Sequence, residues 1–204
     1  MKCSHLLTLL ATVFAIVGCG SPYKRVDPEP VLVAHDTMRV RPSVPWSRAP
    51  RKPFDIAGAE RWIQFAGRID LAPPELTFIG AVAPGKAIIK QRPKDNSQVP
   101  AYRADVTPED LVSMIDVYYR TRVDAMTFET TNAQPETFMG KMGLQLDYNY
   151  VRPDARKWRG RAMIAIVRGK LYVLSLDAEA AGFDSSLPEF DAIVQSASVP
   201  VPSE

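Results

Sequence analysis

Two continuous apolar runs near the C-terminal end constrain the fold of this chain most strongly. Residues 162–167 and 171–176 are almost entirely apolar. Arg168-Gly169-Lys170 between them predicts a tight turn, because glycine accepts the left-handed backbone angles that such turns need. Strands that are apolar on both faces have to be covered on both faces. The sequence therefore predicts a central antiparallel hairpin with a helical layer on each side.

One further strand is predicted to have one buried face and one solvent-exposed face. Residues 144–150 alternate apolar and polar side chains without a break, and successive side chains of a strand point to opposite faces. Weaker strand patterns occupy residues 62–65, 76–79, 87–90 and 125–130. We expect these strands to form a mostly antiparallel sheet.

Two helices are marked by their start signals and by the spacing of their apolar residues. The segment 107–110 reads Thr-Pro-Glu-Asp, which offers an N-cap, a proline in the first turn and acids facing the helix dipole. It predicts a helix over residues 108–122. A second helix should begin near Ser186 and pack its apolar stripe across the hairpin. One helix on each face gives an α+β fold, a three-layer α/β/α sandwich.

The C-terminal part of the chain resembles the Mog1/PsbP-like family. Residues 161–167, the segment 169–174 with its Gly-Lys-Leu-Tyr start, and residues 183–193 follow the order of strand, hairpin turn, strand and closing helix found in that family. The resemblance covers the last third of the chain and implies a Mog1/PsbP-like domain. Because these are packing motifs, it implies a fold rather than a function, and no binding residue of the family carries over.

The N-terminal residues indicate export and lipid attachment. Lys2 precedes an uncharged apolar run over residues 6–17, which is too short for a hydrocarbon core of roughly 30 Å and is typical of a signal peptide. The segment 16–19 reads Ile-Val-Gly-Cys and resembles the bacterial lipobox. The resemblance implies cleavage before Cys19 and acylation of its thiol with fatty acids such as palmitate.

These signals divide the chain into four parts. Residues 1–18 are the predicted signal peptide, residues 54–199 one Mog1/PsbP-like globular domain, and residues 200–204 a short tail. Between them, residues 19–53 hold the lipidated cysteine and seven prolines without periodic hydrophobicity, which predicts a linker. As a flexible coil its ends would lie roughly 30 to 35 Å apart, enough to lift the domain away from the membrane.

Charge and residue types exclude several classes of function. Removing residues 1–18 turns 25 basic and 23 acidic residues into 24 and 23, a balance that does not indicate a nucleic-acid partner. The two histidines are His5 in the signal peptide and His35 in the predicted linker. The predicted domain thus lacks histidine and cysteine, so serine or cysteine nucleophiles have no histidine base and the usual zinc ligands are missing. We expect no enzyme activity, no cofactor and no metal.

A basic stretch supplies the candidate binding site. Its members, expected in a loop before the central strand, are Arg152, Arg156, Lys157, Trp158, Arg159 and Arg161. Cations beside an aromatic ring suit lipopolysaccharide, phospholipid headgroups or an acidic protein. The alternative is a solvated connection in which Trp158 caps the core and Asp154 offsets part of the charge. A second basic stretch over residues 86–94 has the same two interpretations, and tyrosines at 118, 119, 148 and 150 could line a groove.

The sequence therefore predicts a membrane-anchored envelope lipoprotein whose domain acts by binding, as an adaptor for an envelope protein or an anionic envelope component. Gly20, where an aspartate favours inner-membrane retention, indicates the outer membrane and a domain facing the periplasm. The alternatives are a carrier of a small apolar or lipidic ligand and a hydrolase using paired carboxylates. A deep apolar cavity would favour the carrier, and two buried acids within reach of each other would favour the hydrolase.

Overall fold

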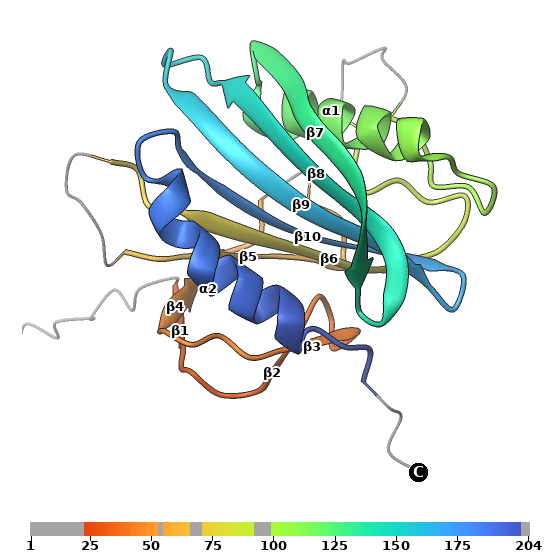
Figure 1. Cartoon of the computed structure of the whole chain (residues 1–204), viewed down its shortest axis with the longest axis horizontal. Coiled ribbons are helices and arrows are strands. Elements are labelled where there is room, and N and C mark those ends of the chain that lie inside the picture. Colours follow the sequence, from red (N-terminus) through yellow and green to blue (C-terminus); the bar gives the residue numbers. More distant parts are fainter. Residues whose placement is uncertain (1–22, 53–54, 66–70, 92–98, 201–204) are drawn as a thin grey trace, which may run out of the picture.

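The computed structural model describes residues 23–52, 55–65, 71–91 and 99–200. An eight-stranded sheet lies between two helices, and a two-stranded sheet lies beside it (Figure 1). The strands are β1 (Lys24–Val26), β2 (Val31–Val33), β3 (Met38–Val40), β4 (Trp46–Arg48), β5 (Ala59–Ile63), β6 (Glu75–Val82), β7 (Thr127–Phe138), β8 (Lys141–Val151), β9 (Lys157–Val167) and β10 (Lys170–Glu179). The helices are α1 (Pro108–Val123) and α2 (Phe183–Ser196).

The large sheet is antiparallel throughout, in the order β1-β4-β5-β6-β10-β9-β8-β7. The predicted central hairpin is confirmed as β9 and β10, which pair from Val167 and Lys170 outward. Arg168 and Gly169 form a two-residue turn in which both have positive φ, 52° and 72°, the turn whose twist matches that of the strands.

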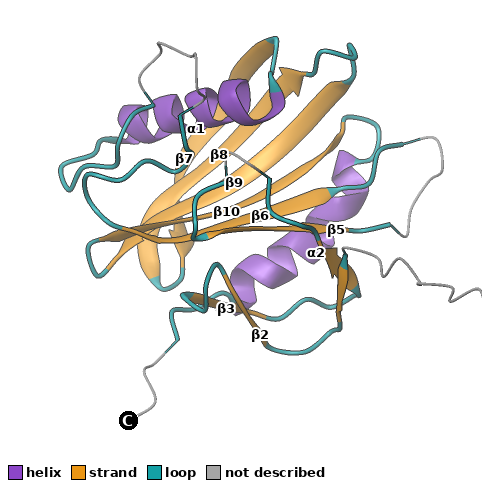
Figure 2. Cartoon of the chain, turned by 180° about the vertical axis from the view of Figure 1, so that it is seen from behind, coloured by secondary structure: helices purple, strands orange, loops and turns teal. Residues whose placement is uncertain are grey.

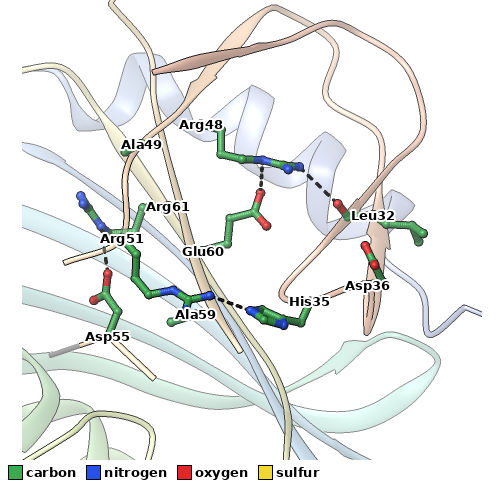
Figure 3. Close-up of a pocket in the computed structure, with 10 residues that line it drawn as sticks. All are labelled: Leu32, His35, Asp36, Arg48, Ala49, Arg51, Asp55, Ala59, Glu60 and Arg61. Carbon is green, nitrogen blue, oxygen red and sulfur yellow. Dashed lines mark hydrogen bonds and ion pairs between the residues drawn. The ribbon is translucent and has the colours of Figure 1, made fainter. Parts of the chain in front are cut away.

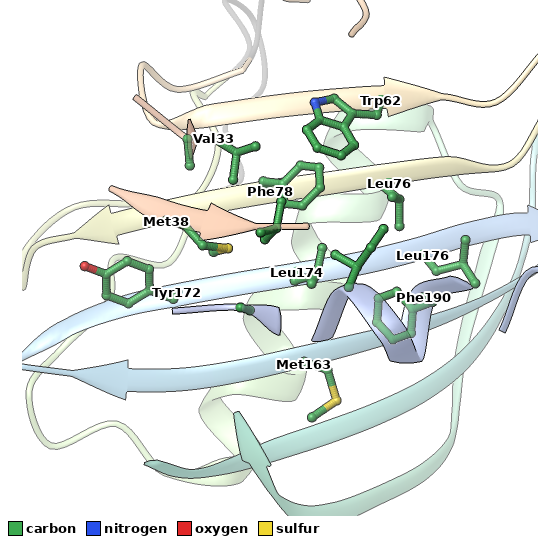
Figure 4. Close-up of a cluster of buried hydrophobic side chains, with 14 of the residues drawn as sticks. Val33, Met38, Trp62, Leu76, Phe78, Met163, Tyr172, Leu174, Leu176 and Phe190 are labelled. Carbon is green, nitrogen blue, oxygen red and sulfur yellow. The ribbon is translucent and has the colours of Figure 1, made fainter. Parts of the chain in front are cut away.

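Both faces of this hairpin are buried, as the apolar runs predicted. In β10, Tyr172 and Leu174 join the core under α2, whereas Leu171 and Val173 join the core under α1. Figure 2 shows α1 over the face opposite α2. Figure 4 shows the core on the α2 side, where side chains of β6, β9 and β10 meet those of β2, β3 and α2. The α+β sandwich inferred from the sequence is thus the observed architecture.

The two helices agree with their predicted positions to different degrees. α1 begins as predicted, because Thr107 and Asp110 form a reciprocal capping box, the side chain of each accepting the backbone N–H of the other. α2 begins at Phe183, three residues before the predicted start, and Pro188 lies inside it. Phe183 is buried and sets the start of the helix. Neither described helix is long and apolar enough to cross a membrane.

The N-terminal segment corrects the predicted linker over residues 19–53. Residues 24–48 contain four strands, and Val33, Met38 and Trp46 are buried in the α2-side core. The indole Nε1 of Trp46 also donates to Glu189 of α2, at 3.2 Å. The prediction was wrong because each strand has only three residues, too few to show a period between prolines. The predicted boundaries at residues 18 and 54, Cys19 and the end of the tail lie outside the described residues.

Two weaker strand predictions had different outcomes. Residues 87–90 form only isolated bridges, Asp55 with Ile89 and Ala87 with Ala101. Residues 125–130 lead into β7, a strand of 12 residues at the edge of the sheet. β7 has an irregular register between Thr130 and Asn132. It also contains Pro135, which a sheet accepts at an edge because proline has no N–H to donate.

Candidate functional site

The predicted basic stretch is divided by the pleat of a strand. β9 begins at Lys157, so the prediction of a loop up to Arg161 was wrong: alternation of polar and apolar residues continues through this part of the chain. Successive side chains point to opposite faces. Trp158 belongs to the core under α1, with the guanidinium of Arg152 3.5 Å from its ring centre. Arg159 and Arg161 lie on the opposite, α2-side face.

The arginines of this stretch are largely paired with acids. Arg156 contacts Asp154 and Glu179, Arg159 contacts Asp184, and Arg161 contacts Asp147 and Asp191. The pair of Arg161 with Asp147 is bidentate, at 2.6 and 3.2 Å. Such pairing satisfies guanidinium donors and reduces the charge available to an outside ligand. Lys157 is exposed at the beginning of the strand.

Arg159 and Arg161 belong to a polar surface that we call the open face. It consists of Glu129 of β7, Gln145, Asp147 and Asn149 of β8, and Arg159 and Arg161 of β9. Figure 1 shows α2 lying beside β9 and leaving much of β7 and β8 uncovered. Asp184 and Asp191 of α2 pair with Arg159 and Arg161 at the border of this face. Pockets of about 500 and 440 Å³ lie on it, one lined by Arg161 and Gln145, the other by Asn149 and Arg159.

A third pocket, of about 290 Å³, lies where the N-terminal segment meets β5 (Figure 3). It places His35, expected in a flexible linker, within the fold, so the inference that the folded domain lacks histidine was wrong. The ring Nε2 of His35 lies 2.6 Å from a guanidinium nitrogen of Arg51. Ala34, His35 and Asp36 all have positive φ between 53° and 60°, a conformation that costs non-glycine residues energy.

The charges of this pocket are mostly paired inside the fold. Arg48 contacts Glu60 at 2.7 Å, and Arg61 contacts the buried Asp55 at 3.6 Å (Figure 3). Glu60 also accepts from the backbone N–H of Ala34. These contacts tie the strained turn and the N-terminal segment to β5. The charged side chains of this pocket therefore stabilise the fold, and their internal pairing leaves few of them to bind a ligand.

A row of buried polar residues crosses the α1-side face of the sheet. Arg61, Glu75 and Thr77 alternate with core residues in β5 and β6, and Ser175 and Asp177 do so in β10. Arg122 from α1 pairs with both Asp55 and Glu75. This row was not predicted, although polar residues at every second position of the apolar strands β6 and β10 are a signal for it.

The two acids of this row, Glu75 and Asp177, lie opposite each other on β6 and β10, and their surroundings shift the two pKa values in opposite directions. Burial raises the pKa of Asp177 to about 6, although the hydroxyl of Tyr119, 2.7 Å away, favours the carboxylate. Burial would also raise the pKa of Glu75, but the charges of Arg122 and Arg61 outweigh it and lower the pKa to about 2. Such a divergence is found in catalytic acid-base pairs. Neither acid lines the pockets described in this section.

The tyrosines predicted as a possible groove form part of the core instead. Tyr118, Tyr119, Tyr148 and Tyr150 are all buried under α1. The hydroxyls of Tyr119 and Tyr148 lie 2.5 Å apart, and both contact Asp177. The hydroxyls of Tyr119 and Tyr148 therefore satisfy a buried acid, and all four rings fill space in the core.

The acids that the sequence offers as paired carboxylates, Glu109 with Asp110 and Asp147 with Asp154, have structural roles instead. Glu109 and Asp110 lie in the first turn of α1, Asp147 pairs with Arg161 and Asp154 with Arg156. Within the described ranges, no cluster of three or more histidine, cysteine, aspartate or glutamate side chains is arranged to hold a metal ion.

The fold is that of a PsbP-like α+β protein. No known protein family and no curated protein matches the sequence. Among solved structures, the chain is similar to cyanobacterial PsbP (CyanoP) from Synechocystis sp. PCC 6803, with 16% identity, a TM-score of 0.54, and coverage of 92% of this chain and 99% of that one. At this identity the likeness establishes the fold alone.

Two further structures are more distant. Protein PA94 from Pseudomonas aeruginosa has 13% identity and a TM-score of 0.49, covering 82% of this chain and 99% of that one. LpqN, which is involved in cell envelope biogenesis in Mycobacterium tuberculosis, has 14% identity and a TM-score of 0.33, covering 89% and 88%. At these scores, neither adds to the fold assignment.

Proposed function

We propose that this protein is a cell-envelope lipoprotein, held by lipid on Cys19 in the outer membrane and facing the periplasm, whose PsbP-like domain acts as a binding adaptor. The observation that carries the binding role is the open face. It is a polar sheet surface with pockets of about 500 and 440 Å³, which are lined in part by polar side chains such as Gln145 and Asn149 that do not belong to the core.

The chemistry of the open face suits a protein segment better than a polyanion. Arg159 and Arg161 are offset by Asp184 and Asp147, so cations and anions alternate over a short distance. Asn149 and Gln145 add amide groups that can donate and accept hydrogen bonds. A partner that presents both charges and backbone amides would satisfy this surface, whereas a purely anionic ligand would meet Asp147 and Glu129.

Crosslinking from the open face tests this proposal. A photoreactive amino acid replaces Asn149 in cells of the native host, and the matched control carries it at Ser113, which is exposed on α1. We expect a discrete crosslinked protein from position 149, none from position 113, and loss of the product in the Cys19→Ser variant, which also loses fatty-acid labelling. Equal products from both positions, or none from position 149, would contradict the adaptor role.

A carrier of small apolar ligands is the second candidate, favoured by one pocket. This pocket of about 410 Å³ is lined mainly by small and apolar residues, including Ile56, Ala81, Val82 and Ile89. Saturable binding of a fluorescent fatty acid, abolished by Ala81→Arg, would support the carrier. The hydrolase is not proposed, because Glu75 and Asp177, although adjacent, are closed off from the described pockets.

A further inference from the structure

We propose that one end of the large sheet rests on the anionic lipid surface to which Cys19 is attached. We call it the anchor end. It is the end at which β5, β8 and β10 finish and β7 and β9 begin, next to the start of α2 in Figure 1. The inference rests on the proposed function, because it requires lipid on Cys19. It goes further by specifying how the domain is oriented on the membrane.

The length of the tether places the membrane close to the folded chain. Tyr23 is the first described residue and follows Cys19 by four positions, so the two can be at most roughly 14 Å apart. β9 alone has 11 residues and is roughly 35 Å long. The tether is therefore shorter than the sheet, and the part of the domain nearest Tyr23 has to stay near the headgroups.

The ring of Tyr23 identifies that part of the domain. It contacts Phe65 edge-to-face, with ring centres 5.1 Å apart, and Phe65 follows the end of β5. The side chain of Phe65 is 60% exposed, which is uncommon for so large an apolar ring. Met126, directly before β7 at the same end of the sheet, is 63% exposed. Two of the most exposed large apolar side chains therefore lie at the end that the tether holds.

Cations accompany these apolar side chains. Lys24, Arg156 and Lys157 are exposed at or near the anchor end. For Arg156 and Lys157 of the predicted basic stretch, the ligand would then be the anionic lipid headgroups. Arg156 is paired with Asp154 and Glu179, so the net attraction to anionic headgroups is modest. A modest attraction suffices, because the tether already removes most of the entropic cost of association.

Single introduced cysteines test the orientation. Apart from Cys3, removed with the predicted signal peptide, Cys19 is the only cysteine, so a cysteine introduced into the lipidated protein is its only free thiol. An environment-sensitive fluorophore is attached at Phe65→Cys or, as the control, at Met142→Cys, which is 72% exposed near the opposite end. Both proteins are reconstituted into vesicles of phosphatidylethanolamine and phosphatidylglycerol that contain brominated lipid.

We expect a blue shift and quenching by brominated lipid at position 65 and neither at position 142. Lys157→Glu should weaken the signal at position 65, whereas Lys141→Glu at the far end should not. Equal signals at both positions would overturn the inference, because they would mean that the domain rotates freely. A signal at position 65 that appears only in native membranes would also overturn it, because it would indicate a protein partner. Flotation with the vesicles separates the two proposals: protein that does not float refutes the anchor, and protein that floats without quenching refutes only the docking.

Discussion

Asp177 is held in surroundings that oppose its ionisation. It is 1% exposed and lies opposite Glu75 on the neighbouring strand. Burial raises the pKa of its carboxyl in the folded state to about 6. In the unfolded chain an aspartate loses its proton near pH 3.9. The stability that Asp177 contributes is therefore fully present below about pH 4 and is lost as the pH rises through about 6.

This linkage predicts how an amide at position 177 behaves. Asp177→Asn cannot ionise, so it should remove the decline in unfolding free energy between pH 4 and 6.5, which is on the order of 3 kcal/mol in the parent protein. Urea unfolding at a series of pH values measures the unfolding free energy of both proteins. Glu109→Gln, at an exposed site of α1, is the control. Identical pH profiles for the parent and the Asp177→Asn variant would show that the carboxyl is not held in its neutral form.

The contact of Tyr148 with Asp177 depends on Gly160, a glycine for which the sequence alone gives no reason. Gly160 lies opposite Tyr148, and a Cβ at position 160 would be 2.1 Å from the tyrosine ring. Only glycine leaves room for the ring to lie across β9 and bring its hydroxyl to Asp177. The basic stretch is predicted from its cations and from Trp158, and neither gives a reason for a glycine between Arg159 and Arg161.

At the scale of elements, the central hairpin determines the layers. Ile164 of β9 is 1% exposed and lies under α1. Ile164→Ala should cost about 2 to 5 kcal/mol of unfolding free energy, the range for removing a large aliphatic side chain from a packed core. Gln145→Ala, on the open face, should change it by no more than about 0.5 kcal/mol. Chemical denaturation compares the two, and small equal losses would mean that β9 lacks its helical cover.

Elements with a complete local signal could be predicted, and those without one could not. The hairpin has continuous apolar runs and a turn signal, β8 has strict alternation over residues 144–150, and α1 has a capping box. These elements could therefore be predicted from their own residues. α2 was placed too late because Pro188 resembles a first-turn proline, whereas burial of Phe183 sets its start. The turn between β7 and β8 uses Met139 and Gly140 at positive φ, and methionine gives no turn signal.

At the scale of the whole molecule, the N-terminal strands are held by contacts with residues more than a hundred positions away. Trp46 and Ser43 both bond to Glu189 of α2, and Arg39 pairs with Ser198. Sequence patterns within a short window cannot report such contacts. For the same reason, the turn pocket at His35 could not be predicted.

Removing one of these contacts measures how firmly the segment is held. Trp46 is 3% exposed, so Trp46→Ala should lower the unfolding free energy by about 3 to 5 kcal/mol. Leu32→Ala, at a side chain that is 36% exposed, is the matched control and should have a small effect. A loss below about 1 kcal/mol in the Trp46→Ala variant would restore the interpretation of residues 24–48 as a loosely attached linker.

The proposed lipid anchor would place many copies of this protein on one surface, and the edge formed by β7 then affects how they meet. Tethered proteins diffuse in two dimensions and collide sideways, so a long, flat, unpaired strand would be a template on which neighbours could add without limit. Pro135 has no N–H to offer an incoming strand, and the irregular register beside Thr130 interrupts a continuous ladder. We therefore expect collisions along this edge to end in separation instead of the growth of a filament.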